Sequence, residues 1–204
     1  MIYGVIELQP CIITEKSKSI KTDKTTNDVS VGVYKIYDSV EMPKYYTEKS
    51  ACFDLSVYLG PEIVHVNVYN RMLMHVVKTV IRMADKNWIR GICLEPGECA
   101  FIPTGLIFNI PEQYKIAVYP RSGVSAKRHI KLANCVAVID EDFTQQTMLP
   151  IFNDSEERQS IYHGDRLAQA EIVPVHRAVF EELSSPIHQK TDRTGGFGHT
   201  GVSV

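Results

Sequence analysis

The sequence has no marked excess of charge of either sign. Its 204 residues include 22 basic and 24 acidic side chains, which gives a net charge of −2 at neutral pH. Proteins that bind nucleic acid through its phosphates usually carry a basic excess, so this balance argues against that function. The chain is 44% hydrophobic and 23% charged. This composition is typical of a globular protein large enough to bury a core without disulfides or metal.

Cysteine and histidine are few, and neither has the spacing of a metal site. The five cysteines form no close pair, and the seven histidines include no two that lie four positions apart. Zinc motifs depend on such pairs, so a zinc site is not expected. An odd, scattered set of cysteines instead indicates free thiols in a reducing compartment.

No segment has the pattern of a signal peptide or a membrane span. The apolar start, residues 1–13, contains Glu7 and Pro10 and lacks a basic leader, so we expect a cytoplasmic protein that does not bind membranes. The sequence also lacks a Gly-x-Gly-x-x-Gly motif and a Walker loop. These absences argue against a Rossmann or P-loop enzyme.

The order of the patterns predicts an all-β domain with an extension at each end. Residues 1–30 form an N-terminal extension whose first ten residues alternate weakly, as in a strand, and whose residues 14–29 are polar. Residues 31–191 form the compact domain, in which short apolar runs alternate with turns between positions 97 and 175. Such spacing is typical of a β-sandwich or jelly roll. Residues 192–204 form a flexible, glycine-rich C-terminal arm.

One segment of the domain, residues 61–91, departs from the β pattern. Its apolar residues follow the spacing of one helix face and predict a partly helical segment; they are Leu73, Val76, Val77, Val80, Ile81 and Ala84. Basic residues fall on another face: Arg71, His75, Lys78 and Arg82. This basic face is interpreted as solvated, with a partner- or phosphate-binding surface as the alternative. The many β-branched residues leave a strand open as well.

Several side chains would suit a ligand that carries phosphates. Carboxylates that could hold a hard cation, directly or through water, are Asp54, Asp140 and Asp142. Donors suited to phosphate oxygens are Arg121, Ser122, Gln169 and Arg193, and flat surfaces for a sugar and a base are Phe143 and Phe197. A carboxylate near a magnesium-bound polyphosphate can act as general base toward water. Singly, the Arg121 and Asp165 segments would be read as β-turns and the acidic run as a solvated turn.

Taken together, five ordered segments resemble the motifs of the trimeric dUTPase family. They are residues 51–55 (ACFDL), 120–127 (PRSGVSAK), 134–143 (NCVAVIDEDF) continuing to Asn153, 164–169 (GDRLAQ) and 193–201 (RTGGFGHTG). The 19-residue step from Arg121 to Asp140 also resembles the family spacing. The sister branch, dCTP deaminase, usually has Arg-Ser-Ser in the second motif. The glycine at position 123 therefore favours the hydrolase branch.

The resemblance implies a jelly-roll subunit in a homotrimer, with active sites between subunits. It implies Mg²⁺-dependent hydrolysis of dUTP to dUMP and pyrophosphate, which lowers dUTP and supplies dUMP for dTMP synthesis. By the matching positions Asp140 would activate the attacking water, and Asp54 would hold magnesium through water. The residues expected to bind substrate are Arg121, Ser122, Gly123, Asn134, Val138, Ile139, Phe143, Gln169, Arg193, Phe197, Gly198, His199 and Thr200.

A few positions depart from the family pattern. Cys52, Ala137 and Gln145 stand where the family usually has glycine, and Phe143 replaces a common tyrosine. An alanine methyl at 137 would reshape the uracil pocket, so a pyrophosphatase for dCTP or a modified pyrimidine is an alternative. Another alternative is a regulatory binding protein on the same fold. The segment 61–91 is absent from a minimal family member, and we consider a contact between it and a partner protein or neighbouring subunit.

Overall fold

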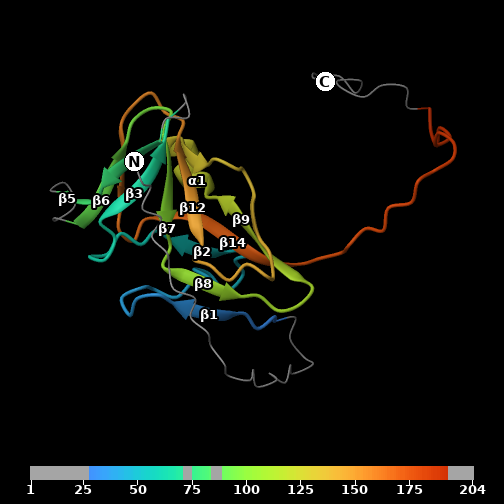
Figure 1. The fold of residues 1–204 in the computed structure, drawn as a ribbon, viewed down its shortest axis with the longest axis horizontal. Helices are drawn as coiled ribbons and strands as arrows, with labels where there is room; N and C mark the ends of the chain where they lie inside the picture. The colour runs from blue at the N-terminus through green and yellow to red at the C-terminus, as the bar shows by residue number, and fades with distance from the viewer. Residues whose placement is uncertain (1–27, 71–74, 84–88, 193–204) are drawn as a thin grey trace, which may run out of the picture.

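The computed structural model describes residues 28–70, 75–83 and 89–192, and within them almost all of the regular secondary structure is β-strand (Figure 1). The strands are β1 (Gly32–Lys35), β2 (Phe53–Ser56), β3 (His65–Tyr69), β4 (His75–Thr79), β5 (Ile81–Met83), β6 (Ile89–Leu94), β7 (Cys99–Pro103), β8 (Leu106–Asn109), β9 (Tyr114–Pro120), β10 (Ile130–Leu132), β11 (Ala137–Ile139), β12 (Met148–Asn153), β13 (Gln159–Tyr162) and β14 (Arg166–Pro174). One short helix, α1 (Ser122–Arg128), joins β9 to β10. The jelly-roll prediction is confirmed.

The strands pair in four antiparallel sheets whose neighbours are mostly distant in sequence. The five-stranded sheet has the order β10-β12-β7-β3-β4, and the four-stranded sheet has the order β11-β9-β14-β2. A three-stranded sheet, β13-β6-β5, and the pair β1-β8 complete the fold. Because most neighbours come from different parts of the chain, the sheets bring widely separated motifs together.

The core follows from the alternation of side chains along each strand. In β3, Val66 and Val68 are buried, while His65, Asn67 and Tyr69 between them are exposed. Successive side chains of a strand point to opposite faces, so one face of β3 joins the core and the other meets solvent. The same alternation in β2 turns one set of its side chains outward, toward the pocket described below.

The prediction of a partly helical segment at 61–91 is wrong for its described residues; Arg71, Leu73 and Ala84 lie outside them. This stretch contains β3, β4, β5 and the start of β6, and β3 pairs with β4 as a hairpin. The apolar residues Val76, Val77 and Val80 are all β-branched, which favours extended backbone. The hairpin adds to the edge of β7, and β5 adds to the edge of β6, so cross-strand pairing outweighed the helical spacing.

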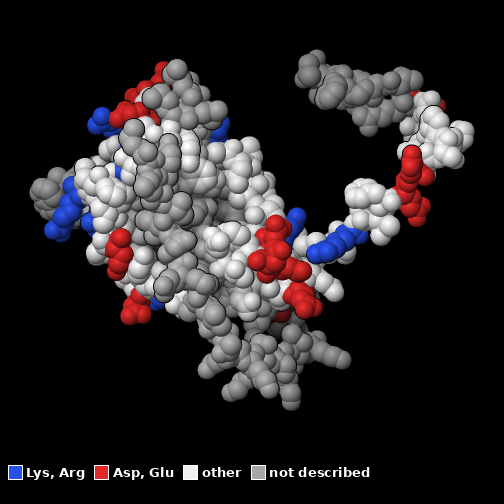
Figure 2. All heavy atoms as spheres, in the orientation of Figure 1, with Lys and Arg blue, Asp and Glu red and all other residues white. Residues whose placement is uncertain are grey.

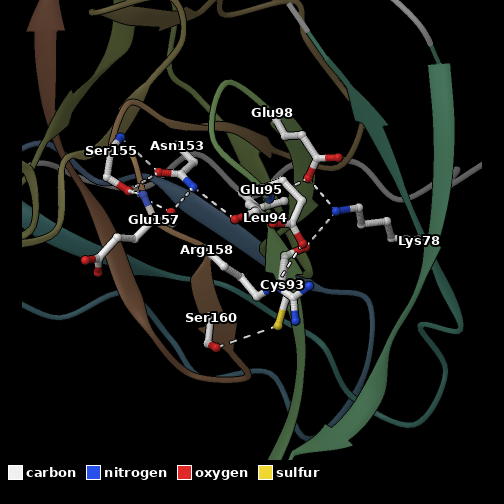
Figure 3. A network of polar contacts seen from close by, with 10 residues as sticks. All are labelled: Lys78, Cys93, Leu94, Glu95, Glu98, Asn153, Ser155, Glu157, Arg158 and Ser160. Atoms are coloured by element: carbon white, nitrogen blue, oxygen red, sulfur yellow. Dashed lines mark hydrogen bonds and ion pairs between the residues drawn. The ribbon is translucent and has the colours of Figure 1, made fainter.

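Two basic side chains of this segment are held by the rest of the chain. Lys78 forms an ion pair with Glu98 and donates to the carbonyl oxygen of Cys93 at 3.0 Å (Figure 3). Arg90 donates to the carbonyl oxygens of Leu59 at 3.0 Å and Ile63 at 2.5 Å. The interpretation of Lys78 as part of a solvated basic face is therefore wrong, because its charge, like that of Arg90, is bound within the subunit.

The third motif ends in a structural residue. Asn153 is completely buried, and its amide donates to the carbonyl oxygens of Leu94 at 2.9 Å and Glu157 at 2.8 Å (Figure 3). Its Oδ1 accepts from the backbone N–H of Ser155 at 3.0 Å. A buried amide satisfied in this way fixes the turn after β12 against the end of β6.

Beyond β14 the chain leaves the sheets as an extended segment (Figure 1). Its apolar side chains lie in the open, with Val179 at 89% and Phe180 at 92% exposure. The strand predicted for residues 1–10 and all but the first residue of the arm predicted for 192–204 lie outside the described residues. Within the described residues, no helix has the length and apolar content that crossing a membrane requires.

Candidate active site

One pocket collects residues from the first, second and fourth motifs. Its walls come from the segment before β2, from α1 and from β14. The lining residues are Tyr46, Ser50, Ala51, Cys52, Asp54, Arg121, Ser122, Gly123, Val124, Lys127 and Gln169. Its volume of about 540 Å³ lies in the range of small-molecule sites. We call it the triphosphate pocket, because the hydrogen-bond donors that line it would suit the oxygens of a triphosphate.

Sheet register explains why Asp54 and Gln169 meet. Asp54 on β2 lies opposite Gln169 on β14, which lies opposite Tyr119 on β9. Residues directly opposite one another in an antiparallel sheet share a face. Their neighbours Phe53 and Ala170 face the core, so the sheet presents its polar residues to the pocket and its apolar residues to the interior.

The second motif forms a short helix, not the β-turn that its Pro-Arg-Ser-Gly sequence suggests when considered alone. Arg121 is extended at the helix N-cap (φ −93°, ψ 126°), and Ser122 begins α1. His129 ends α1 in the left-handed conformation (φ 50°). An added Cβ at Gly123 would meet nothing within 4 Å. The space beside this glycine is open to a ligand.

The carboxylate of Asp54 pairs with two guanidinium groups. Arg121 approaches its Oδ2 at 3.3 Å, and Arg166 approaches the same oxygen at 3.0 Å. Arg121 also donates to the carbonyl oxygen of Arg166 at 2.8 Å. Gln169 donates to the carbonyl oxygen of Pro120 at 3.0 Å, which fixes the orientation of its amide. The pocket therefore combines one carboxylate with several donors suited to anions.

The thiol in this pocket is poorly suited to covalent catalysis. Burial raises the pKa of Cys52, and the nearby carboxylates of Glu171 and Asp54 raise it further. Thiolates are the nucleophilic form of cysteine, so this environment suppresses nucleophilic attack. Tyr119 donates to Glu171 at 2.7 Å, and this hydrogen bond raises the pKa of the phenol. Neither group offers a nucleophile near neutral pH.

Asp140 lines a different pocket, beyond the end of β11. The residues lining it are Glu112, Gln113, Tyr114, Asp140, Glu141, Asp142, Val175 and Arg177. Figure 2 shows acidic side chains gathered where the C-terminal segment leaves the sheets. Glu141 accepts from the backbone N–H of Gln113 at 2.6 Å. This contact fixes the acidic turn that carries Asp140.

The triphosphate pocket and the Asp140 pocket are far apart within one subunit. β2 and β11 are opposite edges of the four-stranded sheet. Three strand spacings separate these edges, which amounts to about 14 Å. The structure thus brings Asp54, Arg121 and Gln169 together but leaves Asp140 in a separate place.

Residues near β11 present both a polar and an apolar surface. Val138 is half exposed on the outer face of the sheet, and Ile139 is buried. Asn134 and Phe143 are exposed on either side of the strand. Ala137 packs against the core cluster, so its methyl group points away from the face that carries Val138. The orientation of this methyl group therefore does not support the expectation that it reshapes a base pocket on the Val138 face.

Some of the site residues expected from the sequence lie outside the described residues, and two residues that line the pocket were not expected. Arg193, Phe197, Gly198, His199 and Thr200 lie outside the described residues. Sequence reasoning did not anticipate that Tyr46 and Lys127 line the triphosphate pocket. Lys127 stands in the second motif and was therefore accessible to sequence reasoning. Tyr46 precedes the first motif and carries no local signal.

Within the described residues, no group of three or more His, Cys, Asp or Glu side chains is arranged to hold a metal ion. Asp54 is the carboxylate of the triphosphate pocket, where it faces phosphate-type donors. Mg²⁺ usually binds proteins through one or two carboxylates, substrate phosphates and water. The pocket therefore fits a Mg²⁺ ion that arrives on a polyphosphate.

Comparison with known proteins gives concordant results. The family model for dUTPase matches residues 88–201. A deoxyuridine 5'-triphosphate nucleotidohydrolase of Francisella tularensis is 34% identical over 163 residues, covering 79% of this chain and 90% of that protein. The enzyme of the same name from Finegoldia magna is 43% identical over 111 residues, covering 54% of this chain and 76% of that protein.

Solved structures of phage dUTPases share the fold. A variant of the Staphylococcus bacteriophage 80alpha dUTPase has a TM-score of 0.60 and 22% identity, covering 87% of this chain and 100% of that chain. The dUTPase of phage phi11 of S. aureus has a TM-score of 0.56 and 20% identity, covering 77% of this chain and 97% of that chain. A structure of a phi11 variant reveals the coordination of a structural Mg(II) ion.

Proposed function

This chain belongs to the dUTPase family, and on that premise we propose that it hydrolyses dUTP to dUMP and pyrophosphate. The observation that carries the proposal is the meeting of Arg121, Ser122 and Gln169 around Asp54. These donors suit the oxygens of a triphosphate. The reaction lowers dUTP and supplies dUMP for dTMP synthesis.

In this mechanism Asp140 accepts a proton from the water that attacks the α-phosphorus. Its carboxylate is exposed at the end of β11, where it can reach a bound nucleotide. Direct attack by water is favoured over a covalent route because burial keeps the Cys52 thiol protonated. Arg121, Ser122, Gly123 and Gln169 bind the phosphates.

The base and sugar bind around β11. Asn134 and the backbone at Val138 and Ile139 would read the uracil edge, and Phe143 would pack on the deoxyribose. The inward orientation of the Ala137 methyl removes that residue as a reason to expect a different base. In the C-terminal arm Arg193 would reach the phosphates and Phe197 would stack on the base, with Gly198, His199 and Thr200 also contacting substrate.

Asp54 would hold Mg²⁺ through water, at a site shared with the substrate phosphates. When bound, the ion neutralises charge on the triphosphate. Arg121 lies beside the same carboxylate at 3.3 Å. The side chains of this pocket therefore orient the polyphosphate from the protein side.

The two pockets also support a homotrimer with shared sites. Asp140 lies about 14 Å across the sheet from Asp54 within one chain, by the usual strand spacing. A second subunit that places its Asp140 beside the first subunit's Arg121 would complete the site. Closed symmetric assemblies are the usual way in which identical chains share sites.

The test is pyrophosphate release in the presence of Mg²⁺ from dUTP, dCTP, dTTP and UTP. We expect strong preference for dUTP and a loss of about 10²- to 10⁴-fold in Asp140→Asn, since a general base contributes that much. Glu112→Gln removes a charge from the same pocket and should lose far less. Preference for another nucleotide would keep the mechanism but change the substrate to that nucleotide. No release from any of them would reject the hydrolase and favour a binding role for the chain.

A further inference from the structure

The two arginines that pair with Asp54 occupy different places. Arg121 lines the triphosphate pocket. Arg166 reaches the same carboxylate oxygen from the start of β14, with its Nη1 at 3.0 Å. The Asp54 side chain is only 11% exposed. Its negative charge therefore depends on these two partners more than on water.

This arrangement matters when a phosphate enters the pocket. Arg121 can turn toward the phosphate more readily when Asp54 keeps another protein cation, because a buried carboxylate without a partner is costly. Arg166 is that second cation. The position of Arg166 thus governs how freely Arg121 can bind substrate.

An aromatic ring holds Arg166 in place. The guanidinium carbon of Arg166 lies 3.9 Å from the centroid of the Tyr46 ring. Guanidinium groups stack on aromatic faces by cation–π attraction. Arg166 is thereby held between the ring of Tyr46 and the carboxylate of Asp54.

The segment that carries Tyr46 is anchored at both ends. On one side the backbone N–H of Asp54 donates to the carbonyl oxygen of Lys44 at 3.0 Å. On the other side Ser50 donates its backbone N–H to Thr47 at 3.1 Å, and the two hydroxyls lie 2.6 Å apart. The ring itself is 55% exposed, so burial alone does not explain its position.

We infer that Tyr46 is a positioning residue for the triphosphate pocket. It holds Arg166 against Asp54 through its ring face, and so leaves Arg121 available for phosphate. This inference rests on the proposed function, because it assigns the pocket to the triphosphate of the nucleotide. Tyr46 acts through Arg166 and is not itself a catalytic residue.

The adjacent Tyr45 provides a matched control. Its ring is 54% exposed and meets Phe53 edge-on, with the ring centroids 5.7 Å apart. Loss of that ring removes a contact with the core, not with a cation. Tyr45→Leu should therefore lower stability and leave phosphate affinity unchanged.

The experiment measures tripolyphosphate binding by calorimetry, together with KM and kcat for dUTP in the full-length protein. In Tyr46→Leu we expect the dissociation constant and KM to rise about three- to tenfold, as the loss of a cation–π contact implies. The value of kcat should stay within about twofold, since Asp140 is untouched. Tyr46→Phe keeps the ring face, so its dissociation constant for tripolyphosphate and its KM for dUTP should both stay close to the wild-type values.

The outcomes separate this inference from the proposed function. A wild-type protein that hydrolyses dUTP while Tyr46→Leu retains full affinity overturns the inference alone. The inference also fails if Tyr46→Phe is as weak as Tyr46→Leu, or if Tyr45→Leu is equally weak. A protein that hydrolyses no nucleotide but binds tripolyphosphate in a Tyr46-dependent way supports the inference and rejects the proposed function. Failure to bind tripolyphosphate at all overturns the inference.

Discussion

His163 accepts a hydrogen bond inside the fold, from the backbone N–H of Leu59 to its Nδ1 atom at 3.0 Å. Only the neutral imidazole can accept at this nitrogen. Burial lowers the pKa of His163 from its ordinary value of 6.5, and the charge of Arg90 adds to this effect. Protonation of His163 therefore opposes folding.

This shift predicts a pH dependence of stability. As pH falls below 6.5, the unfolded chain takes up a proton that the folded chain resists. The free energy of unfolding should therefore be highest above that pH and decrease below it, by up to about 1.4 kcal/mol per pH unit from this group. Urea unfolding from pH 7.5 to 5 measures the slope. His163→Gln should reduce it, whereas His188→Gln, which removes an exposed imidazole, should not.

Cys135 has a positive φ of 58° in the turn that leads into β11. A side chain in the left-handed region costs roughly 1–2 kcal/mol, and glycine avoids this cost while losing some entropy on folding. Cys135→Gly should therefore raise the free energy of unfolding by about 0.5–1 kcal/mol. Cys99→Gly, at the first residue of β7, is the control and should lower it. A loss of stability in both variants would contradict the explanation from backbone strain.

At the residue scale, the sequence predicts the motif residues of the site better than the residues that hold them in position. Asp54, Arg121, Gln169 and Asp140 were predicted in one group; within one subunit the structure brings the first three together and leaves Asp140 in another pocket. Tyr46 was missed because its partner, Arg166, lies on another strand and no spacing along the chain signals the contact. A cation–π contact of this kind depends on sheet register, which a single sequence does not reveal.

At the scale of strands, β4 is attached to the body through Lys78. The Lys78 side chain is only 22% exposed, and its ammonium pairs with Glu98, which also accepts from the backbone N–H of Glu95 at 2.7 Å (Figure 3). Removal of one partner leaves the other charge poorly solvated. Lys78→Met should lower the free energy of unfolding by about 1–3 kcal/mol in urea titrations.

Lys131 provides the comparison for this prediction. Its ion pair with Asp154 has side chains that are 43% and 44% exposed. Exposed pairs contribute roughly 0–1 kcal/mol, so Lys131→Met should cost at most that amount. Equal losses in the two variants would show that the Lys78 pair is no stronger than a surface pair.

The error between helix and strand in this segment has a physical cause. Val76, Val77 and Val80 fit one face of a helix and also suit a strand, so their spacing alone does not discriminate. The segment forms strands because β3 pairs with the edge of β7, and β4 pairs in turn with β3. Pairing with a strand that is distant in sequence cannot be predicted from a local pattern. The β pattern between positions 97 and 175 was predicted because turn residues mark the ends of its apolar runs.

At the scale of the whole molecule, the separation of the two pockets predicts complementation between inactive variants. If sites are shared between subunits, Arg121→Ala and Asp140→Asn each eliminate activity alone. An equimolar refolded sample would then recover about a quarter of its sites by random assortment. The measurement is dUTP hydrolysis after the two variants are unfolded together and refolded.

Two controls accompany this prediction. Light scattering should give a mass of about 69 kDa, three times the chain mass of 23.0 kDa, as expected for a closed trimer. A mixture refolded from Asp140→Asn and Asp140→Ala should remain inactive. A protein of 23.0 kDa in solution, or no recovery in the mixed sample, would contradict the shared-site model.

The β3–β4 hairpin has a consequence for how such a chain changes over evolutionary time. A hairpin can be gained at the edge of β7 without any change in the register of the strands already present. Here, however, Val66 and Val68 have become part of the core, at 3% and 0% exposure. A descendant that lost the segment would expose apolar surface left behind on its neighbours. Deletion of this hairpin would therefore cost stability, even though the hairpin lies outside the pairing of the other strands of the sheet.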